Sequence, residues 1–200
     1  MTSGGLASLA YPPAPEADYA KHIVMPGQHF VSWGPTEIAT LLGSCVAACI
    51  WDQNRRIGGM NHFMLPDAPR ENSVNDASFP LRYGLHAMER LINDLLMMGA
   101  KRETLLAKVF GGGNITGACG TANVGRRNSE FVLDFLRKDK IRVGAIDLGG
   151  MHSRRIRFYT DTGKVRVYRV GAANQQARQL EDQYRLELKS TPEQGDTVFF

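Results

Sequence analysis

The chain has few cysteines and no long apolar run. Its 200 residues include three cysteines, and an odd number this small does not suggest a disulfide framework. No apolar stretch is long enough to cross a bilayer, so we expect a protein that is not membrane-inserted. No cationic segment leads into an apolar stretch near residue 1, so no secretory signal is expected. These absences predict a cytoplasmic protein, because thiols stay reduced in that compartment.

Charge of one sign is also weak. The chain has 24 Lys and Arg against 20 Asp and Glu, a formal net charge of +4, which we interpret as ordinary solubilising charge. The basic residues are not clustered with aromatic platforms, so no nucleic acid is expected as a partner. No second Cys or His stands at ligand spacing from Cys119, and the glycines at 111–113 lack the Gly-Lys-Ser/Thr ending of a phosphate loop. We therefore expect neither a metal nor an organic cofactor.

The most informative stretch present is residues 40–66. Two apolar runs flank the polar residues 52–55, which have turn chemistry, and this pattern predicts a β-hairpin buried on at least one face. Cys45 stands at the start of the first strand and His62 near the end of the second. Because a hairpin makes residues far apart in sequence into cross-strand neighbours, we expect these two side chains to lie close together.

A cysteine beside a histidine suits thiol-based acyl transfer. The histidine takes the thiol proton and lowers the thiol pKa, and the thiolate is the nucleophile. Gly43 and Ser44 precede Cys45, and N–H groups of such a glycine turn can hold a developing oxyanion. The alternative is that a cysteine in an apolar strand is a small core residue. We interpret Cys49 as such a core residue. For Cys45, the residues alone leave both the catalytic and the core interpretation open.

The rest of the chain predicts a single α/β domain with extensions. We expect a flexible N-terminal extension at residues 1–21, a domain at 22–170 and a C-terminal tail at 171–200. An apolar stripe of Leu81, Leu85, Met88, Ile92 and Leu95 predicts an amphipathic helix at 81–98, and a second is predicted at 123–138. Further strands are predicted at 28–33, 37–41, 105–110, 141–146, 155–159 and 165–168, the last two forming a hairpin. The two helices are expected to cover a face of layered sheet.

Three other segments have open interpretations. The polar residues 67–78 are expected to form a loop beside the hairpin. Glycines 111–113 are expected to allow close backbone approach to the turn at Cys45. Residues 174–188 are predicted to be a helix with Leu180, Tyr184 and Leu188 on one face, which either caps the domain or binds a partner.

Several motifs occur together in a specific order. They are Leu-Gly-Ser-Cys-Val-Ala at 42–47, Gly-Met-Asn-His-Phe-Met-Leu-Pro at 59–66, Lys-Val-Phe-Gly-Gly-Gly-Asn at 108–114, Asn-Val-Gly-Arg-Arg-Asn at 123–128 and Asp-Leu-Gly-Gly at 147–150. The match that they mark extends over most of the chain, roughly from residue 28 to residue 170. In sequence and spacing they closely resemble the CheD family of chemoreceptor glutamine deamidases.

The resemblance implies roles for particular residues. It implies that Cys45 is the nucleophile and His62 the base. The third catalytic member is a threonine just upstream of the cysteine, for which Thr40 is the candidate; family members differ by one residue in its position, and Ala39 fills the alternative here. The resemblance also implies a layered α/β sandwich of mixed sheet, the CheD-like deamidase fold.

The implied function is that of a protein-glutamine glutaminase. Such an enzyme hydrolyses glutamine side-chain amides of methyl-accepting chemotaxis receptors to glutamate through a thioester, and glutamyl methyl esters fit the same route. The alternative is a chemotaxis regulatory module that docks on receptors or on a CheC-type phosphatase, with catalysis secondary. A cysteine amidase acting on small amides is a third option.

Overall fold

Nine strands and three α-helices make up the part of the chain that the computed structural model describes, residues 19–66, 79–114, 119–170 and 175–190. The helices are α1 (Phe79–Met97), α2 (Cys119–Lys138) and α3 (Gln175–Ser190), and a short 3₁₀ turn spans Arg102–Thr104. The strands are β1 (Ala20–Ile23), β2 (His29–Trp33), β3 (Thr36–Leu42), β4 (Val46–Asp52), β5 (Ile57–Asn61), β6 (Leu105–Gly111), β7 (Arg142–Leu148), β8 (Ser153–Tyr159) and β9 (Val165–Val170).

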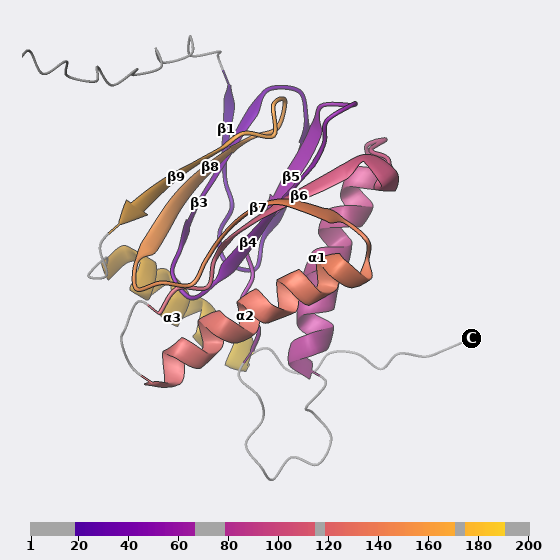
Figure 1. Ribbon diagram of the computed structural model, residues 1–200. Coiled ribbons are helices and arrows are strands. Elements are labelled where there is room, and N and C mark those ends of the chain that lie inside the picture. Colours follow the sequence, from indigo (N-terminus) through magenta and orange to yellow (C-terminus); the bar gives the residue numbers. More distant parts are fainter. Residues whose placement is uncertain (1–18, 67–78, 115–118, 171–174, 191–200) are drawn as a thin grey trace, which may run out of the picture.

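The strands form two mixed sheets that pack face to face. One has four strands in the order β1-β3-β8-β9, and the other has five in the order β2-β5-β4-β6-β7. The pairs β1–β3 and β6–β7 are parallel, and the other pairs are antiparallel. Helices α1 and α2 cover the outer face of the five-stranded sheet, whereas α3 lies at one end of the two-sheet sandwich (Figure 1). The expected mixed α/β architecture is therefore confirmed.

Strand β4 is central because it is buried on both faces. Its even-numbered residues Val46, Ala48 and Ile50 belong to the core under α1 and α2, and its odd-numbered residues Ala47 and Cys49 belong to the core between the sheets. Such a strand loses the polar alternation of a half-exposed strand and is an apolar run in the sequence. The helix-side core also includes Phe63, Met88, Leu91, Ile92, Leu95, Val109, Val132 and Leu136. The core between the sheets also includes Val24, Ile38, Leu42, Met60, Met64, Ile156, Phe158 and Tyr184.

The predicted hairpin exists as β4 and β5. Its turn is organised by Asp52, whose Oδ1 accepts from the N–H of Asn54 at 2.9 Å. The upstream half of the first run is a different strand, β3, and lies in the other sheet. Strand β1 was not predicted, and it begins at Ala20, within the expected extension. Its four residues carry no clear alternation, and its pairing with β3 is what makes it a strand.

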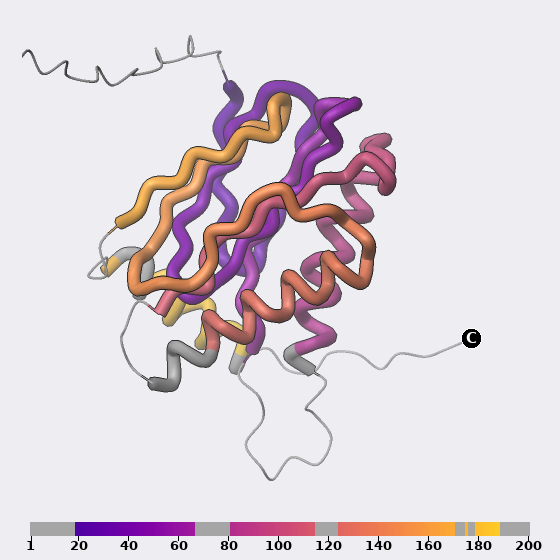
Figure 2. The backbone as a smooth tube through the Cα atoms, in the orientation of Figure 1, coloured from indigo at the N-terminus to yellow at the C-terminus, as the bar shows by residue number. Residues whose placement is uncertain are grey.

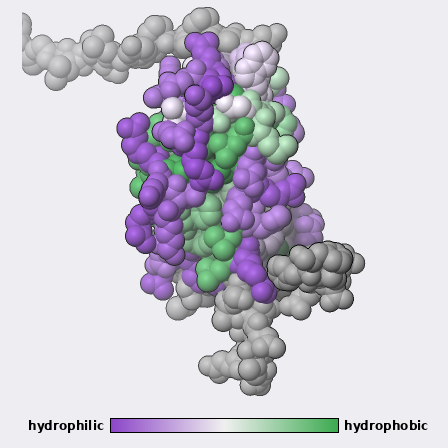
Figure 3. Space-filling model, turned by 90° about the vertical axis from the view of Figure 1, so that its right-hand side faces the viewer, coloured by the Kyte–Doolittle hydropathy of each residue, from purple (hydrophilic) through white to green (hydrophobic). Residues whose placement is uncertain are grey.

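The helices differ from expectation in detail. Helix α1 buries Met88, Ile92 and Leu95, but Leu81 and Leu85 are exposed, so the predicted stripe is wrong in its first two members. Figure 3 looks onto the side of the molecule where α1 lies, and hydrophilic side chains separate the apolar ones there. Helix α2 begins at Cys119, four residues before the predicted start at residue 123. The predicted loop at 67–78 lies outside the described residues.

Candidate functional site

The connection between β3 and β4 is the three-residue turn of Gly43, Ser44 and Cys45. It carries the chain from the four-stranded sheet to the five-stranded sheet, at the end of the sandwich where α3 lies (Figure 2). Ser44 is 1% exposed and Cys45 is 0% exposed. The predicted nucleophile therefore lies at a crossing between the layers, on an enclosed turn.

The glycines at 111–113 hold this turn in place. The N–H of Gly113 donates to the carbonyl of Gly43 at 2.7 Å, and the N–H of Gly112 donates to the carbonyl of Cys45 at 2.8 Å. Gly111 has a φ of 110°, and a Cβ added there would lie 2.1 Å from the carbonyl oxygen of Cys45. Only glycine fits this approach. The prediction that these glycines allow close backbone contact with the turn is confirmed.

Asn128 of α2 holds the remaining carbonyl of the turn. Its Nδ2 donates to the carbonyl oxygen of Ser44 at 2.9 Å, and its Oδ1 accepts from the N–H of Leu65 at 2.8 Å. The side chain is fully buried, so both bonds are shielded from water. Asn128 thus ties the turn to the segment that follows His62. The carbonyls of Gly43, Ser44 and Cys45 all accept hydrogen bonds within the protein, and these bonds fix the turn. The N–H of Cys45 is then available to bind a ligand.

Cys45 and His62 lie on one face of the sheet. Val46 pairs with Phe63 across the ladder, which places Cys45 opposite Met64 and His62 diagonally across from Cys45. Diagonal neighbours on one face are within reach of longer side chains. The cross-strand neighbourhood predicted from the hairpin is therefore present. Both residues face the four-stranded sheet, and both are almost completely buried.

Thr40 determines which nitrogen of His62 carries the proton. Its Oγ1 lies 2.7 Å from the carbonyl oxygen of Val24 and 2.8 Å from Nδ1 of His62. A carbonyl only accepts, so the single hydroxyl proton goes to Val24, and the hydroxyl oxygen accepts a proton from Nδ1. The lone pair of the ring is then on Nε2, which is buried and has no hydrogen-bond partner among the described residues. Ala39, the alternative position, faces the outer side of the sheet, next to Arg157.

The surroundings of His62 keep its imidazole neutral. Complete burial lowers the pKa of His62 from 6.5 to about 4, and the nearby carbonyl of Val24 offsets a part of this. A charged imidazolium loses hydration that the enclosed site does not replace. At neutral pH the ring therefore has a free base at Nε2.

Helix α3 places a carboxylate on the turn. Oε1 of Glu181 accepts from the backbone N–H of Cys45 at 3.1 Å, and Oε2 accepts from Oγ of Ser44 at 2.9 Å. Glu181 is only 6% exposed. The sequence pattern singled out the apolar residues of this helix, but a lone glutamate on a charged helix gave no signal of a role.

The thiol pKa differs from expectation. Burial raises the pKa of Cys45 well above its usual value, and the adjacent Glu181 carboxylate raises it further, both by Coulomb repulsion of the thiolate and by a hydrogen bond to the thiol. The expectation of a lowered pKa is wrong for the arrangement in which Glu181 is seated. Burial likewise raises the pKa of Cys49, as suits the core residue it was interpreted to be.

A cavity of about 340 Å³ lies on the other side of the histidine. Its lining residues include Thr40, His62, Val24, Pro26 and, from α3, Leu180. Cys45 does not line it. The cavity gives His62 a route to the surface, whereas Cys45 is covered by α3.

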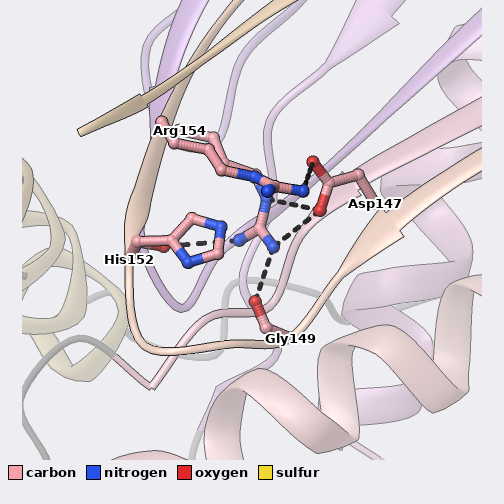
Figure 4. Close-up of polar contacts among 5 residues, drawn as sticks. Asp147, Gly149, His152 and Arg154 are labelled. Atoms are coloured by element: carbon pink, nitrogen blue, oxygen red, sulfur yellow. Dashed lines mark hydrogen bonds and ion pairs between the residues drawn. The ribbon is translucent and has the colours of Figure 1, made fainter. Parts of the chain in front are cut away.

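A buried arginine supports the neighbouring loop. Arg154 is 1% exposed, and its guanidinium donates to Oδ1 of Asp147 at 2.8 and 3.0 Å and to the carbonyl of Gly149 at 2.6 Å (Figure 4). Its other terminal nitrogen donates to the carbonyl of His152. The carbonyl of Gly150 in this loop accepts from the N–H of Asn114, directly after the glycines that hold the turn at Cys45.

Other candidates are placed outside the site. His29, on β2, pairs with Asp94 of α1 through a contact of 2.7 Å between Nε2 and Oδ2. Within the described ranges, no group of three or more His, Cys, Asp or Glu side chains gathers as metal ligands do, and no helix has the length and apolarity needed to span a bilayer. The sequence did not assign roles to Asn128 and Glu181, because side chains that act on a turn from distant helices have no local pattern.

Known proteins resemble this chain over most of its length. The profile of a family described as "CheD chemotactic sensory transduction" matches residues 64–169. A protein of Thiobacillus denitrificans named "Probable chemoreceptor glutamine deamidase CheD" is 48% identical over 178 residues, which cover 88% of each chain. A similarly named protein of Shewanella oneidensis is 43% identical, covering 88% of this chain and 86% of its own. One from a Janthinobacterium species is 43% identical over 92% of this chain and 90% of its own.

Proposed function

The chain belongs to the CheD family, and on this basis we propose that it is a chemoreceptor glutamine deamidase. Its substrates are glutamine side chains on the cytoplasmic helices of methyl-accepting chemotaxis receptors, and its products are glutamate and ammonia. The relatives' names support the reaction and the receptor substrate. The geometry of Cys45 and His62 supports the way in which the reaction proceeds.

The first half of the reaction forms a thioester. Nε2 of His62 removes the thiol proton of Cys45, and the sulfur attacks the carboxamide carbon of the substrate. The backbone N–H of Cys45 donates to the oxygen that becomes negative, and Gly43 and Ser44 hold this amide in place. His62 returns the proton to the nitrogen as the C–N bond breaks, and ammonia leaves.

The second half hydrolyses the thioester. His62 takes a proton from water, the water oxygen attacks the thioester carbon, and the C–S bond breaks to release glutamate and regenerate the thiol. Thr40 keeps Nδ1 protonated throughout, so that Nε2 remains the nitrogen that exchanges protons. No step needs a metal or an organic cofactor.

The observation that carries this proposal is the hydrogen-bond chain from Val24 through Thr40 to Nδ1 of His62. A core histidine without function has no need of a buried, unpartnered nitrogen, which costs free energy. Here His62 stands diagonally across the ladder from Cys45, on the same face of the strands. An enclosed base next to a thiol is the arrangement that acyl transfer uses.

Mass spectrometry of receptor cytoplasmic fragments tests the proposal. Fragments incubated with the protein in water labelled with heavy oxygen should gain one labelled oxygen at each converted glutamine, and the same fragments with a Cys45→Ser protein should not. Free glutamine should be converted far more slowly than glutamine on a folded receptor helix. Equal kcat/KM for both substrates would instead indicate a general amidase.

Glutamyl methyl esters extend the same proposal. Methanol replaces ammonia as the leaving group, and the thioester is identical. If the chain served only as a docking module for receptors or a CheC-type phosphatase, it would bind receptor fragments without changing their mass. That result with an intact thiol would overturn the proposed catalysis.

A further inference from the structure

One side chain of the protein fills the part of the site that the oxyanion needs. The N–H of Cys45 donates to Oε1 of Glu181 at 3.1 Å, and the hydroxyl of Ser44 donates to Oε2 at 2.9 Å. Glutamate is the chemical product of glutamine deamidation. A glutamate carboxylate on the nucleophile's own amide is therefore placed as a reaction product would be before it leaves.

We propose that Glu181 occupies the product subsite of the enzyme, so that α3 is an internal copy of a product-bound substrate helix and covers Cys45 until a receptor helix displaces it. This inference rests on the proposed function and deepens it. It identifies Ser44 and the N–H of Cys45 as the groups that recognise the substrate side chain. It also identifies the surface under α3 as the surface that receives the substrate helix.

Ser44 has the chemistry that such a subsite requires. A carboxylate only accepts hydrogen bonds, whereas the NH₂ of a carboxamide only donates. The Ser44 hydroxyl does both, so it can donate to Oε2 of a glutamate and accept from the NH₂ of a glutamine at the same place. The N–H of Cys45 meets an oxygen in either case. The same pair of groups therefore holds both the substrate and the product.

The seating of α3 indicates which positions of a substrate helix meet the enzyme. Leu180 lines the same cavity as His62, and Leu188 packs against the core between the sheets. Tyr184 is 6% exposed; its ring lies on Gly27, where an added Cβ would come within 2.7 Å, and its hydroxyl contacts that of Tyr83. These residues share one face of the helix with Glu181. A substrate helix seated in this way meets the enzyme with the residue before its glutamine and the residue three positions after it.

Helix α3 is attached in a way that permits exchange. Leu180, Glu181, Tyr184 and Leu188 face the rest of the protein, whereas Leu186 on the opposite side of the helix is 67% exposed. Four residues separate Val170, the end of β9, from Gln175, the start of α3. So short a connection holds the helix at high effective concentration. A free glutamate or a short peptide therefore competes poorly, whereas a long receptor helix that makes more contacts competes well.

Glu181→Gln gives the sharpest test, because it turns the occupant into a substrate. The Cys45 thiol should attack the carboxamide that this substitution introduces; the C–S bond forms, the C–N bond breaks and ammonia leaves with the thiol proton. Water then cleaves the C–S bond and restores Glu181. Peptide mass spectrometry of the purified variant should show glutamate at residue 181, with heavy oxygen when the protein is incubated in labelled water. Adding Cys45→Ser should preserve the glutamine.

Two other glutamines of α3 serve as internal controls for that experiment. Gln179 and Gln183 flank residue 181 on α3 and are exposed. They should remain glutamine in the same peptides, because only residue 181 reaches the turn. Cys45-dependent conversion confined to residue 181 supports the proposal. A residue 181 that stays glutamine in a protein that deamidates receptor fragments overturns it.

A second measurement separates this inference from the proposed function. Glu181→Ala removes the hydrogen bonds to the turn, so the KM for a receptor fragment should fall about ten-fold with little change in kcat, and iodoacetamide should label Cys45 about ten-fold faster. Asp182→Asn, an exposed neighbour on α3, should change neither. An active enzyme whose KM and labelling are unchanged by Glu181→Ala contradicts the inference alone. A wild-type protein that converts no receptor glutamine contradicts the proposed function.

Discussion

The two faces of β4 have different neighbours. The face that meets α1 and α2 packs against aliphatic and aromatic side chains, such as Leu91 and Leu136. The opposite face meets the four-stranded sheet, and that layer also contains Cys45, with His62 and Thr40 buried at its end. The helix-side layer supplies stability through apolar burial, whereas the layer between the sheets combines burial with titratable groups whose pKa values it shifts.

The two cysteines give the largest contrast within the layer between the sheets. We expect Cys45→Ser to reduce receptor deamidation to background while the protein stays folded, because a serine hydroxyl is a far weaker nucleophile than a thiolate. Cys49→Ser should keep its activity and lose about 1–3 kcal/mol of stability, because it adds a hydroxyl to an apolar strand. Activity assays and urea unfolding of both variants measure this. If Cys45→Ser stayed active while Cys49→Ser was folded but inactive, the nucleophile would be Cys49 and not Cys45.

The next comparison is between two histidines, His62 and His29. His62→Ala should lower kcat by about 10²–10⁴-fold, because it removes the group that moves the proton. His29→Ala is the matched control, because its ring pairs with Asp94 on the helix side, away from Cys45. Steady-state kinetics with a receptor fragment compares them. Equal losses for the two variants would mean that the layer between the sheets has no special part in catalysis.

A truncation on the helix side should affect stability alone. Leu91 is 0% exposed on the inner face of α1, so Leu91→Ala should lower the free energy of unfolding by about 2–5 kcal/mol. The kcat of the folded fraction should remain that of the wild type. Denaturant titration and kinetics below the unfolding transition measure both quantities. A large fall in kcat without a shift of the denaturation midpoint would mean that the helix-side layer also contributes to catalysis.

Acid should weaken the fold through His62. Its pKa is about 4 in the folded protein and 6.5 ordinarily, so between these values the unfolded chain binds a proton that the folded chain does not. Stability is therefore complete above the ordinary pKa and is lost as the pH falls toward the folded one, by about 2 kcal/mol between pH 7.5 and pH 5. Urea midpoints across this range measure the loss. His62→Gln should flatten the part of the pH dependence that this residue contributes, and an unchanged slope would speak against it.

Thr40→Val should have the smallest effect. Valine keeps the shape of the side chain but cannot hold Nδ1, so kcat should fall about ten-fold, as expected for the loss of one buried hydrogen bond. The KM should stay constant. The pH–rate profile should shift, because the proton of the His62 ring is then no longer held on Nδ1. Thr40→Ser keeps the hydroxyl and should restore most of the rate. A Thr40→Ser variant as slow as Thr40→Val would indicate a packing role only.

Much of the fold was predictable where local chemistry determines structure. The turn at Asp52 and the alternation in β8 and β9 act over a few residues, so both hairpins could be predicted. The pairing of β1 with β3 and the separation of β3 from β4 into two sheets depend on packing between distant segments. Leu81 and Leu85 fit a helical stripe, yet this end of α1 leaves them exposed.

The relative placement of the candidate site residues was predictable, and their surroundings were less so. Cys45 and His62 follow from a hairpin that places them on one face, and Thr40 was named through a resemblance. Its bond to Val24 requires β1 and β3 to pair, which no local pattern indicates. The expected low thiol pKa is wrong because burial raises the pKa of Cys45, and Glu181, from a helix far along the chain, raises it further.

The three carbonyl contacts of the nucleophile turn have a consequence for the order of protein synthesis. They come from Gly112, Gly113 and Asn128, and the last closes a loop of 84 positions to Ser44. Such distant contacts form late in folding, because long loops must close first. A nascent chain that ends before Asn128 therefore carries Cys45 as an ordinary thiol. Because α3 follows Asn128 in the chain, the helix that carries Glu181 has been synthesised by the time the ribosome releases a protein with the assembled turn.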